Sequence, residues 1–266
     1  MRSRPQKDSP AKKSPPTKPG LHLYRIPGLP EIRKGENLSR CIVEAAQKAG
    51  LRLEHGDILV VAQKIVSKAE GAGVRLKAVK PSAKALEHAA RWNKDPRVVE
   101  LVFRESRRIL RSDRALIVET RHGFVCANAG IDHSNVPGDD VVTLLPKNPN
   151  RSAKKLMAAL RKRTRKHIAV IISDTFGRPW RLGLINVAIG SAGLQVLRDL
   201  RGTRDRHGKP LTATVLAVAD ELAAAAGLLM GKTEGTPVVL IRGYAFQPSS
   251  ETAASIIRPA SEDLFR

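Results

Sequence analysis

The sequence predicts an α+β fold, in which mixed sheets are flanked by helices. Three observations favour it. Apolar, β-rich runs are interspersed with segments of helical periodicity. Two of the β-rich runs, within residues 115–132, flank the turn sequence "TRHG" as the strands of an antiparallel hairpin do. Apolar residues make up 42% of the 266 residues, which is typical of a globular protein, and no internal repeat is visible. This mixture favours α+β over a doubly wound sheet.

The first half of the chain predicts these elements in order. A loop leads into an amphipathic helix that ends at Gly50, because glycine readily takes the backbone conformation that closes a helix. Ile58 to Ala62 is a fully apolar run and predicts a buried strand that runs into a polar turn. Residues 82–110 predict two helices broken near Pro96, since proline ends the helix before it. The hairpin of residues 115–132 follows.

The second half begins with a strongly basic segment. Residues 151–166 hold eight basic residues and no acidic one, with Leu156, Met157 and Leu160 at helical spacing. They predict an amphipathic helix with a solvated basic face. The elements expected after it are a strand in 167–177, a glycine-rich and then helical stretch in 188–200, a β-like start that becomes a helix in 211–231, and a strand in 236–246.

The domain organisation follows from composition. Residues 1–20 are rich in proline, serine and lysine and predict a disordered basic tail. Residues 21–248 predict a folded domain with room for two subdomains, and 249–266 a C-terminal tail. No apolar run approaches the roughly 20 residues of a membrane helix, and the N-terminus has no apolar core of a secretory signal. Two cysteines, Cys41 and Cys126, build no disulfide framework, so both are expected to be reduced in a cytoplasmic protein without membrane contact.

The formal net charge of +22 attracts polyanions and anionic small molecules alike. The basic segment 151–166 makes a nucleic-acid-binding protein one hypothesis. Aromatic residues are only 3% of the chain, which argues against a base-stacking surface.

Polar residues follow three apolar strands, where side chains are held by a rigid scaffold. Asp132 and Asp174 form the natural metal pair, because Mg²⁺ takes oxygen ligands from one or two carboxylates. Thr175 adds a hydroxyl. Lysine and arginine nearby could bind phosphate. The competing interpretation is that "DHSN" and "DT" are ordinary turn and helix-cap sequences. The run "AGLLMGKT" is not a P-loop, because a helical segment precedes it rather than a strand.

Several long segments resemble the coenzyme F420-0:γ-glutamyl ligases. They are "DILVVAQKIVSKAEG", "ETRHGFVCANAGIDHSNV", "IISDTFGRPWRLGLINVAIG", "AVADELAAAAGLLMGK" and "PVVLIRG", in the family's order. The resemblance implies a GTP-dependent amide ligase that joins L-glutamate to the lactyl carboxylate of the deazaflavin F420-0, and then to the growing γ-linked tail. It further implies Mg²⁺ or Mn²⁺, stimulation by K⁺, and the family's α+β fold as an intertwined homodimer.

The resemblance also implies roles for individual residues. Four matched segments imply GTP contacts: Leu29, Pro30, Glu31 and Ile32; Gln63, Lys64 and Lys68; Asn135; and Met230, Gly231, Lys232, Thr233, Glu234 and Gly235. "GIDHSN" and "SDT" imply that Asp132 and Asp174 hold the catalytic metal, with Thr175 beside them. Archaeal relatives carry an acidic metal ligand where this chain has Lys232, so either Glu234 takes that role or water fills the metal position.

The implied chemistry explains the residue types. Transfer of the GTP γ-phosphoryl group to the acceptor carboxylate gives an acyl phosphate, which the glutamate amine attacks with release of phosphate. This needs charge neutralisation and positioning, which aspartates, metal and lysines supply. Arg178, Trp180 and Arg181 are, from charge alone, hypothetical contacts of the anionic acceptor. A ligase of the same fold with another acidic acceptor remains an alternative, as does the nucleic-acid-binding protein.

Overall fold

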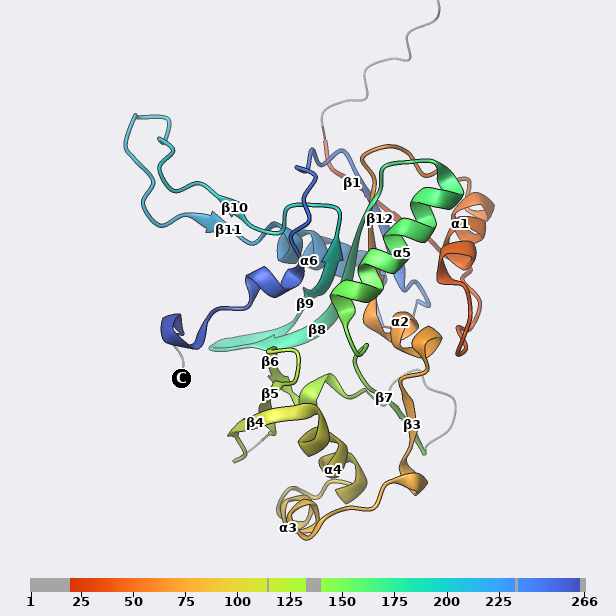
Figure 1. The fold of residues 1–266 in the computed structure, drawn as a ribbon, viewed down its shortest axis with the longest axis vertical. Helices are drawn as coiled ribbons and strands as arrows, with labels where there is room; N and C mark the ends of the chain where they lie inside the picture. The colour runs from red at the N-terminus through yellow and green to blue at the C-terminus, as the bar shows by residue number, and fades with distance from the viewer. Residues whose placement is uncertain (1–19, 114, 133–139, 233, 264–266) are drawn as a thin grey trace, which may run out of the picture.

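A computed structural model of the chain describes residues 20–113, 115–132, 140–232 and 234–263. Its centre is a five-stranded mixed sheet (Figure 1). β2 and β8 pair in parallel, and every other neighbouring pair is antiparallel. In spatial order the strands are β1 (His22–Arg25), β12 (Val238–Arg242), β2 (Ile58–Ala62), β8 (Ala169–Arg178) and β9 (Arg181–Ala192).

Helices cover both faces of this sheet, which explains why β2 is apolar throughout. Leu59 and Val61 face one hydrophobic cluster, whereas Ile58 and Val60 face another, as the alternation of a strand requires. The first cluster lies under α1 (Leu38–Lys48), α2 (Gln63–Glu70) and α5 (Pro149–Thr164). The second lies under α6 (Val218–Met230). The expected helix over 151–166 is confirmed: Leu156 and Leu160 are buried, while the basic side chains lie largely on the outer face.

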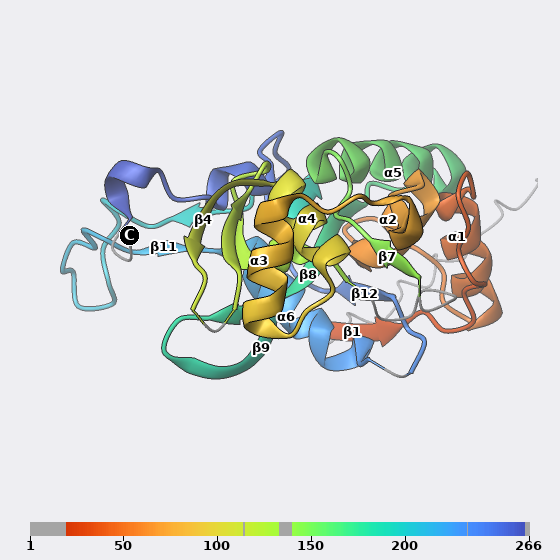
Figure 2. The same ribbon diagram turned by 90° about the horizontal axis from the view of Figure 1, so that it is seen from below.

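A second group of elements lies below the central sheet in Figure 1 and in the foreground of Figure 2. Its own apolar cluster includes Ala89, Val102 and Val118. The two helices expected around Pro96 are confirmed, and so is the hairpin. The elements are α3 (Ala83–Trp92), α4 (Pro96–Glu105) and the three-stranded sheet of β4 (Ser106–Arg111), β5 (Ile117–Thr120) and β6 (Val125–Ala127).

Short elements connect these two groups and close the chain. β3 (Gly73–Arg75) pairs with β7 (Val141–Thr143), and β10 (Arg198–Asp199) pairs with β11 (Val215–Leu216). Single 3-10 turns span Leu76–Ala78, Asn128–Gly130, Ala253–Ile256 and Ala260–Glu262.

β8 and β9 extend beyond the sheet as a two-stranded ribbon, which corrects two expectations. The competing interpretation of "DT" as a turn or helix cap is wrong: the strand expected in 167–177 continues through Asp174 and Thr175 to Arg178 and returns at Arg181 through a two-residue loop. Residues 188–200 contain no helix, because β9 runs to Ala192 and the next element is β10. Pairing with a partner strand overrides the turn-forming residues of "SDTFGR".

Two further boundaries differ from expectation. The segment after β2 is the helix α2, not a polar turn. Its Ile65 and Val66 are buried against the first cluster, and Gly71 ends it in the left-handed conformation. Residues 106–110, expected to continue a helix, form β4, which pairs with β5. The expected mixture of sheets and flanking helices is nevertheless confirmed.

The N-terminal tail, apart from Gly20, lies outside the described residues. Among the described helices, none combines the length and the apolar character needed to span a bilayer. Residues 249–263 pack as an irregular segment with two 3-10 turns against β9 and α6.

Candidate active site

The parallel pair β2 and β8 opens at its carboxyl end into a cleft of about 270 Å³. Side chains of parallel neighbours converge at such an edge, which is where sites of sheet proteins are commonly built. Five parts of the chain line the cleft: residues 29–32, the β2–α2 junction, Asp132, the β8–β9 ribbon, and the loop after α6.

The β2–α2 junction brings a helix N-terminus to this cleft. Ala62 ends β2 and serves as the N-cap of α2, and it has no side chain that could accept a hydrogen bond from the first turn. The first N–H groups of a helix lack partners within the helix and carry partial positive charge. Gln63 is 2% exposed and its Oε1 accepts a hydrogen bond from Ser67 at 2.9 Å. The junction therefore offers a rigid, electropositive wall that suits an anion.

Two lysines of α2 are paired with carboxylates across the cleft. Lys64 Nζ lies 2.8 Å from Asp132 Oδ2, and Lys68 Nζ lies 2.5 Å from Glu31 Oε1. Lys64 and Lys68 lie four residues apart, so both project from one side of the helix. The lysine side chains are largely shielded, at 17% and 12% exposed. Cations held in this way are oriented before any ligand arrives.

Asp174 lies in the part of β8 that continues past the sheet, opposite Val187 of β9. Its pKa is raised from the ordinary 3.8 to about 6, chiefly by burial and in smaller part by the neighbouring Asp132. The Thr175 backbone N–H, Lys232 and Lys64 oppose this rise. The nearby Cys126 thiol has a pKa raised to about 12, first by burial and then by Asp174, so it is no nucleophile at neutral pH. Two carboxylates close together with inadequate compensation are the arrangement that a divalent cation relieves.

A polar network continues from Asp174 onto β9 and α6. Thr175 Oγ1 donates to Asn186 Oδ1 at 3.3 Å and accepts from Lys232 Nζ at 3.0 Å. Asn186 Nδ2 lies 3.5 Å from Ser173 Oγ, beside Met230. The strand register places Asn186 directly opposite Thr175. Lys232 is thereby tied to the strand that carries Asp174.

The loop after α6 depends on a glycine. Gly231 has φ +59°, and a Cβ at this position would collide with the carboxylate of Glu234. Gly235 also has positive φ, at +60°. Only glycine combines this backbone with so close an approach. Glu234, the candidate metal ligand, is exposed and does not line the cleft, so a role for it stays a prediction.

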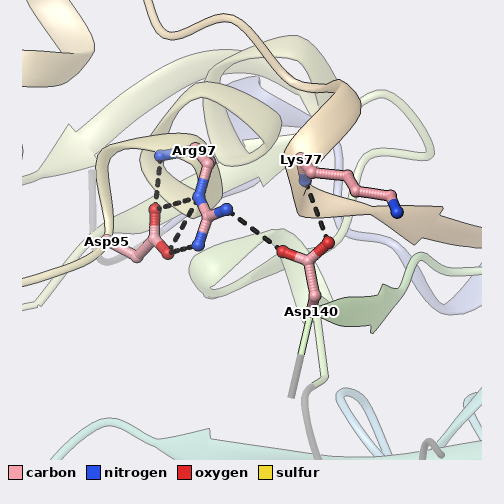
Figure 3. Close-up of polar contacts among 4 residues, drawn as sticks. All are labelled: Lys77, Asp95, Arg97 and Asp140. Atoms are coloured by element: carbon pink, nitrogen blue, oxygen red, sulfur yellow. Dashed lines mark hydrogen bonds and ion pairs between the residues drawn. The ribbon is translucent and has the colours of Figure 1, made fainter. Parts of the chain in front are cut away.

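Asp132 is fixed by the segment that follows it. Its backbone pairs with Thr143 of β7 in both directions, at 3.1 and 2.9 Å. β7 begins after Asp140, whose carboxylate accepts from Arg97 Nη1 at 3.1 Å and from the Lys77 backbone N–H at 3.2 Å (Figure 3). Arg97 is in turn held by Asp95. The second group of elements, through Arg97 of α4, therefore anchors β7, the strand that pairs with Asp132.

The structure gathers nearly all of the sequence-predicted residues around this one cleft. The residues that line it are Leu29, Pro30, Glu31, Ile32, Gln63, Lys64, Lys68, Asp132, Asp174, Thr175, Met230, Gly231, Lys232 and Gly235. Asn135 and Thr233 lie outside the described residues. The lining residues lie close enough together to form one binding site. The role of each residue remains a prediction.

Arg178, Trp180 and Arg181 do not line the cleft. They form the tip of the β8–β9 ribbon, where Arg178 pairs with Arg181 and Trp180 occupies the left-handed region at φ +57°. Arg178 is four residues beyond Asp174 along an extended strand, which corresponds to roughly 13 Å. Their expected contact with the acceptor is therefore not supported by proximity to the cleft.

The sequence interpretation missed Ser173, Asn186 and Thr236, which also line the cleft. Ser173 directly precedes Asp174, and polar residues in an apolar strand were a usable signal. Asn186 had no such signal, because its position depends on the register of β9 against β8. Thr236 is 5% exposed and follows the glycine loop.

The donor set fits one divalent cation rather than a dedicated protein cage. Asp132 and Asp174 supply carboxylate oxygens and Thr175 a hydroxyl, which suits an ion that keeps water and phosphate oxygens as its remaining ligands. In the described part of the chain, no group of three or more histidine, cysteine, aspartate or glutamate residues has metal-binding geometry.

Comparison with known proteins agrees with this arrangement. The model of the F420-0:gamma-glutamyl ligase family matches residues 28–243. The "Coenzyme F420:L-glutamate ligase" of Methanothermobacter thermautotrophicus is 47% identical over 251 residues, covering 93% of this chain and 99% of that protein. The proteins of the same name from Methanopyrus kandleri and Methanocaldococcus jannaschii are 44% and 41% identical, covering 93% and 90% of this chain and 98% and 94% of theirs. The matched region contains every segment that lines the cleft, and the resemblance read from the motifs is confirmed: the chain belongs to the F420-0:γ-glutamyl ligase family.

Proposed function

We propose that the protein is a GTP-dependent ligase that joins L-glutamate to coenzyme F420-0 and then adds γ-linked glutamates. The observation that carries the proposal is the cleft at the carboxyl ends of β2 and β8, where two aspartates and three lysines meet beside a helix N-terminus. This combination suits a nucleotide triphosphate with a divalent cation. The relatives that carry the name coenzyme F420:L-glutamate ligase are similar over more than nine-tenths of the chain.

The cleft divides into complementary parts in this proposal. The uncapped N-terminus of α2, with Lys64 and Lys68, binds the phosphate chain. Lys232, tied to Thr175, neutralises charge on the opposite side. Leu29 and Ile32 offer an apolar surface for the nucleotide base. Binding of GTP would exchange the present pairs of Lys64 and Lys68 for contacts with phosphate.

Asp132, Asp174 and Thr175 would hold Mg²⁺ or Mn²⁺, and the bound ion would supply neutralisation of the charge on the phosphate groups. The Asp174 carboxyl must be ionised to serve as a ligand, so a metal would compete with a proton for it only at pH values near or below its pKa of about 6. Stimulation by K⁺ remains a prediction from the family resemblance.

The reaction then runs in two balanced steps. A carboxylate oxygen of the acceptor attacks the γ-phosphorus of GTP, the bond to the bridging oxygen breaks, and GDP leaves. The neutral amine of L-glutamate attacks the acyl carbon, the bond to phosphate breaks, and the amine loses a proton as the amide forms. The residues of the cleft contribute alignment and charge neutralisation, which dominate phosphoryl transfer.

The test is a turnover assay followed by mass spectrometry. Purified protein with GTP, Mg²⁺, L-glutamate and F420-0 should yield products heavier by successive glutamyl units, with one GDP for each. Asp174→Asn should abolish this product, and Arg111→Gln, an exposed residue outside the cleft, should not. An unchanged acceptor mass with both Mg²⁺ and Mn²⁺ would refute the proposal. Turnover of another acidic acceptor in parallel reactions would instead favour the alternative substrate.

We also propose that the protein is a homodimer assembled through the β8–β9 ribbon. Three apolar side chains near its tip are strongly exposed: Trp180 at 78%, Leu182 at 99% and Leu184 at 66%. A contiguous exposed apolar surface on a projecting ribbon favours association. Sedimentation analysis should give a dimer for the wild type and a monomer for Leu182→Glu. Leu86→Glu, on an exposed site of α3, is the control, and a monomeric wild type would contradict the proposal.

A further inference from the structure

A second hollow of about 300 Å³ lies beside the cleft, along the free edge of β9. Its walls come from the β5–β6 turn, from the β8–β9 ribbon, from the start of α6, and from the C-terminal segment that follows β12. Figure 1 shows β6 on one side of the ribbon and the C-terminal segment on the other.

The lining is aromatic and aliphatic, with polar groups at few places. Phe124 and Phe176 lie with ring centroids 6.2 Å apart and planes inclined by 66°. Val125, Val187 and Ile257 complete the apolar walls. Cavities of roughly 300 Å³ and above with such walls are typical of sites for ring-containing small molecules, which gain affinity from burial of their faces.

Two carboxylates line the hollow, those of Asp220 and Asp263, and that of Asp220 is held in a fixed position. Asp220 stands in the first turn of α6, and its Oδ1 accepts from the backbone N–H of Ala188 at 2.8 Å. Asp220 thereby satisfies a backbone N–H on the edge of β9. The same hydrogen bond fixes the orientation of the carboxylate and so of its second oxygen. Arg258 lines the hollow as well and is exposed. An apolar body with a few oriented polar groups is the pattern that fixes the pose of a ligand.

The register of the ribbon joins this hollow to the cleft. Asp174 lines the cleft, and Val187, its partner across the two strands, lines the hollow. Phe176, two residues beyond Asp174, lies on the same face of β8, roughly 7 Å further along. The cleft and the hollow therefore lie next to each other along the β8–β9 ribbon.

We propose that this hollow binds the planar ring system of the acceptor while the acceptor's carboxylate lies at the cleft. The inference rests on the proposed ligase function and adds a position for the part of the substrate that does not react. Remote binding of this kind holds the reacting group in place and contributes to turnover. It also gives the enzyme a means of selecting a ring-bearing acceptor over a simple acid.

The test fills the hollow without touching the cleft. Val125 is 41% exposed, so Val125→Trp adds bulk to the hollow with little change in the core. Val215→Trp is the matched control, since Val215 is 39% exposed, lies in a strand and lines neither space. Thermal unfolding verifies that both variants fold. Steady-state kinetics then give KM for F420-0, GTP and L-glutamate separately.

We expect Val125→Trp to raise KM for F420-0 by at least about tenfold and to leave KM for GTP within about twofold. Equilibrium dialysis with the ring and sugar-alcohol part of the acceptor, which lacks the phosphodiester and the carboxylate, should show the same loss of binding. Equal KM values for F420-0 in the two variants would overturn the inference. If the wild type is active in the same assay, the proposed ligase function would still stand. A lowered kcat at unchanged KM and unchanged dialysis would also overturn it. A wild type that ligates nothing would remove the proposed function itself.

Discussion

Asp174→Asn should make the ligand-free protein more stable while removing its activity. Asparagine has nearly the shape of aspartate but carries no charge, so the variant isolates the cost of holding this carboxylate ionised. In the native structure burial, with a contribution from Asp132, raises the pKa of Asp174 from 3.8 to about 6. A carboxyl group whose pKa is higher in the folded state binds its proton more tightly there. Ionisation of Asp174 at neutral pH therefore lowers the free energy of unfolding.

The magnitude follows from the two pKa values. The interval from 3.8 to about 6 corresponds to about 3 kcal/mol, at about 1.4 kcal/mol for each pH unit. The penalty is complete above pH 6 and decreases as the pH falls toward 3.8. Linkage predicts that ionisation of Asp174 lowers the free energy of unfolding by about 3 kcal/mol near pH 7.5 and by about 1 kcal/mol near pH 4.5. Local relaxation in the native state reduces both values, so they are upper bounds.

The assay is urea unfolding in the presence of a chelator at both pH values, followed by fluorescence. We expect Asp174→Asn to unfold at higher urea than the wild type near pH 7.5, and the difference to shrink near pH 4.5. Added Mg²⁺ should stabilise the wild type more than the variant, because ligand binding raises stability only where the site is intact.

Asp132→Asn provides the contrast. Asp132 forms an ion pair with Lys64 and its side chain is 32% exposed, so its loss should change stability by less than about 1 kcal/mol. Equal or lower stability of Asp174→Asn near pH 7.5, or a stability difference that does not vary with pH, would refute the reasoning about Asp174.

Three further substitutions test the scaffold and the cleft. Arg242→Ala should lower the free energy of unfolding by about 3–5 kcal/mol, measured by urea unfolding, because Asp57 is fully buried and Arg242 donates to both of its oxygens at 2.8 Å; a loss below about 1 kcal/mol would contradict this. Gly231→Ala should reduce kcat/KM for GTP by at least about tenfold with little loss of stability, since the added methyl group displaces the Glu234 carboxylate and strains a backbone with φ +59°; normal kinetics would show that the loop conformation is not needed. Lys232→Ala should raise KM for GTP, measured by GDP release, by about tenfold, and Lys232→Arg should restore part of the loss; an unchanged KM in the alanine variant would remove this lysine from the site.

The sequence was most informative where local pattern and tertiary structure agree. The buried strand Ile58–Ala62, the helices on either side of Pro96, and the hairpin of residues 115–132 all have periodicity that matches their surroundings. The family motifs also identified most of the residues that line the cleft, because these residues occupy short continuous segments. Asp132 and Asp174 come from distant parts of the chain. Backbone pairing with β7 positions Asp132, and Asp174 is part of β8.

Sequence interpretation failed where a partner strand decides the conformation. "SDTFGR" contains glycine and polar residues that favour a turn, yet it continues β8 because β9 pairs with it, and the turn comes only at Pro179 and Trp180. The polar residues among 63–70 predict a turn, yet this segment is the helix α2. Its buried residues lie at helical spacing and pack against the first cluster. The contribution of Asn186 follows only from the register of two strands, and no short-range pattern encodes a register.

The parts of the chain that form the cleft lie far apart in sequence, from residues 29–32 to residues 230–237. β2 and β8 are neighbours in the sheet although more than a hundred residues separate them. A fragment that lacks either β2 or β8 therefore cannot form the cleft, because the cleft requires the long-range pairing of these two strands. Any opening that separates these two strands destroys it. In the proposed function, a bound nucleotide would therefore slow hydrogen exchange in β2 and β8, because it stabilises only the state in which these two strands are paired.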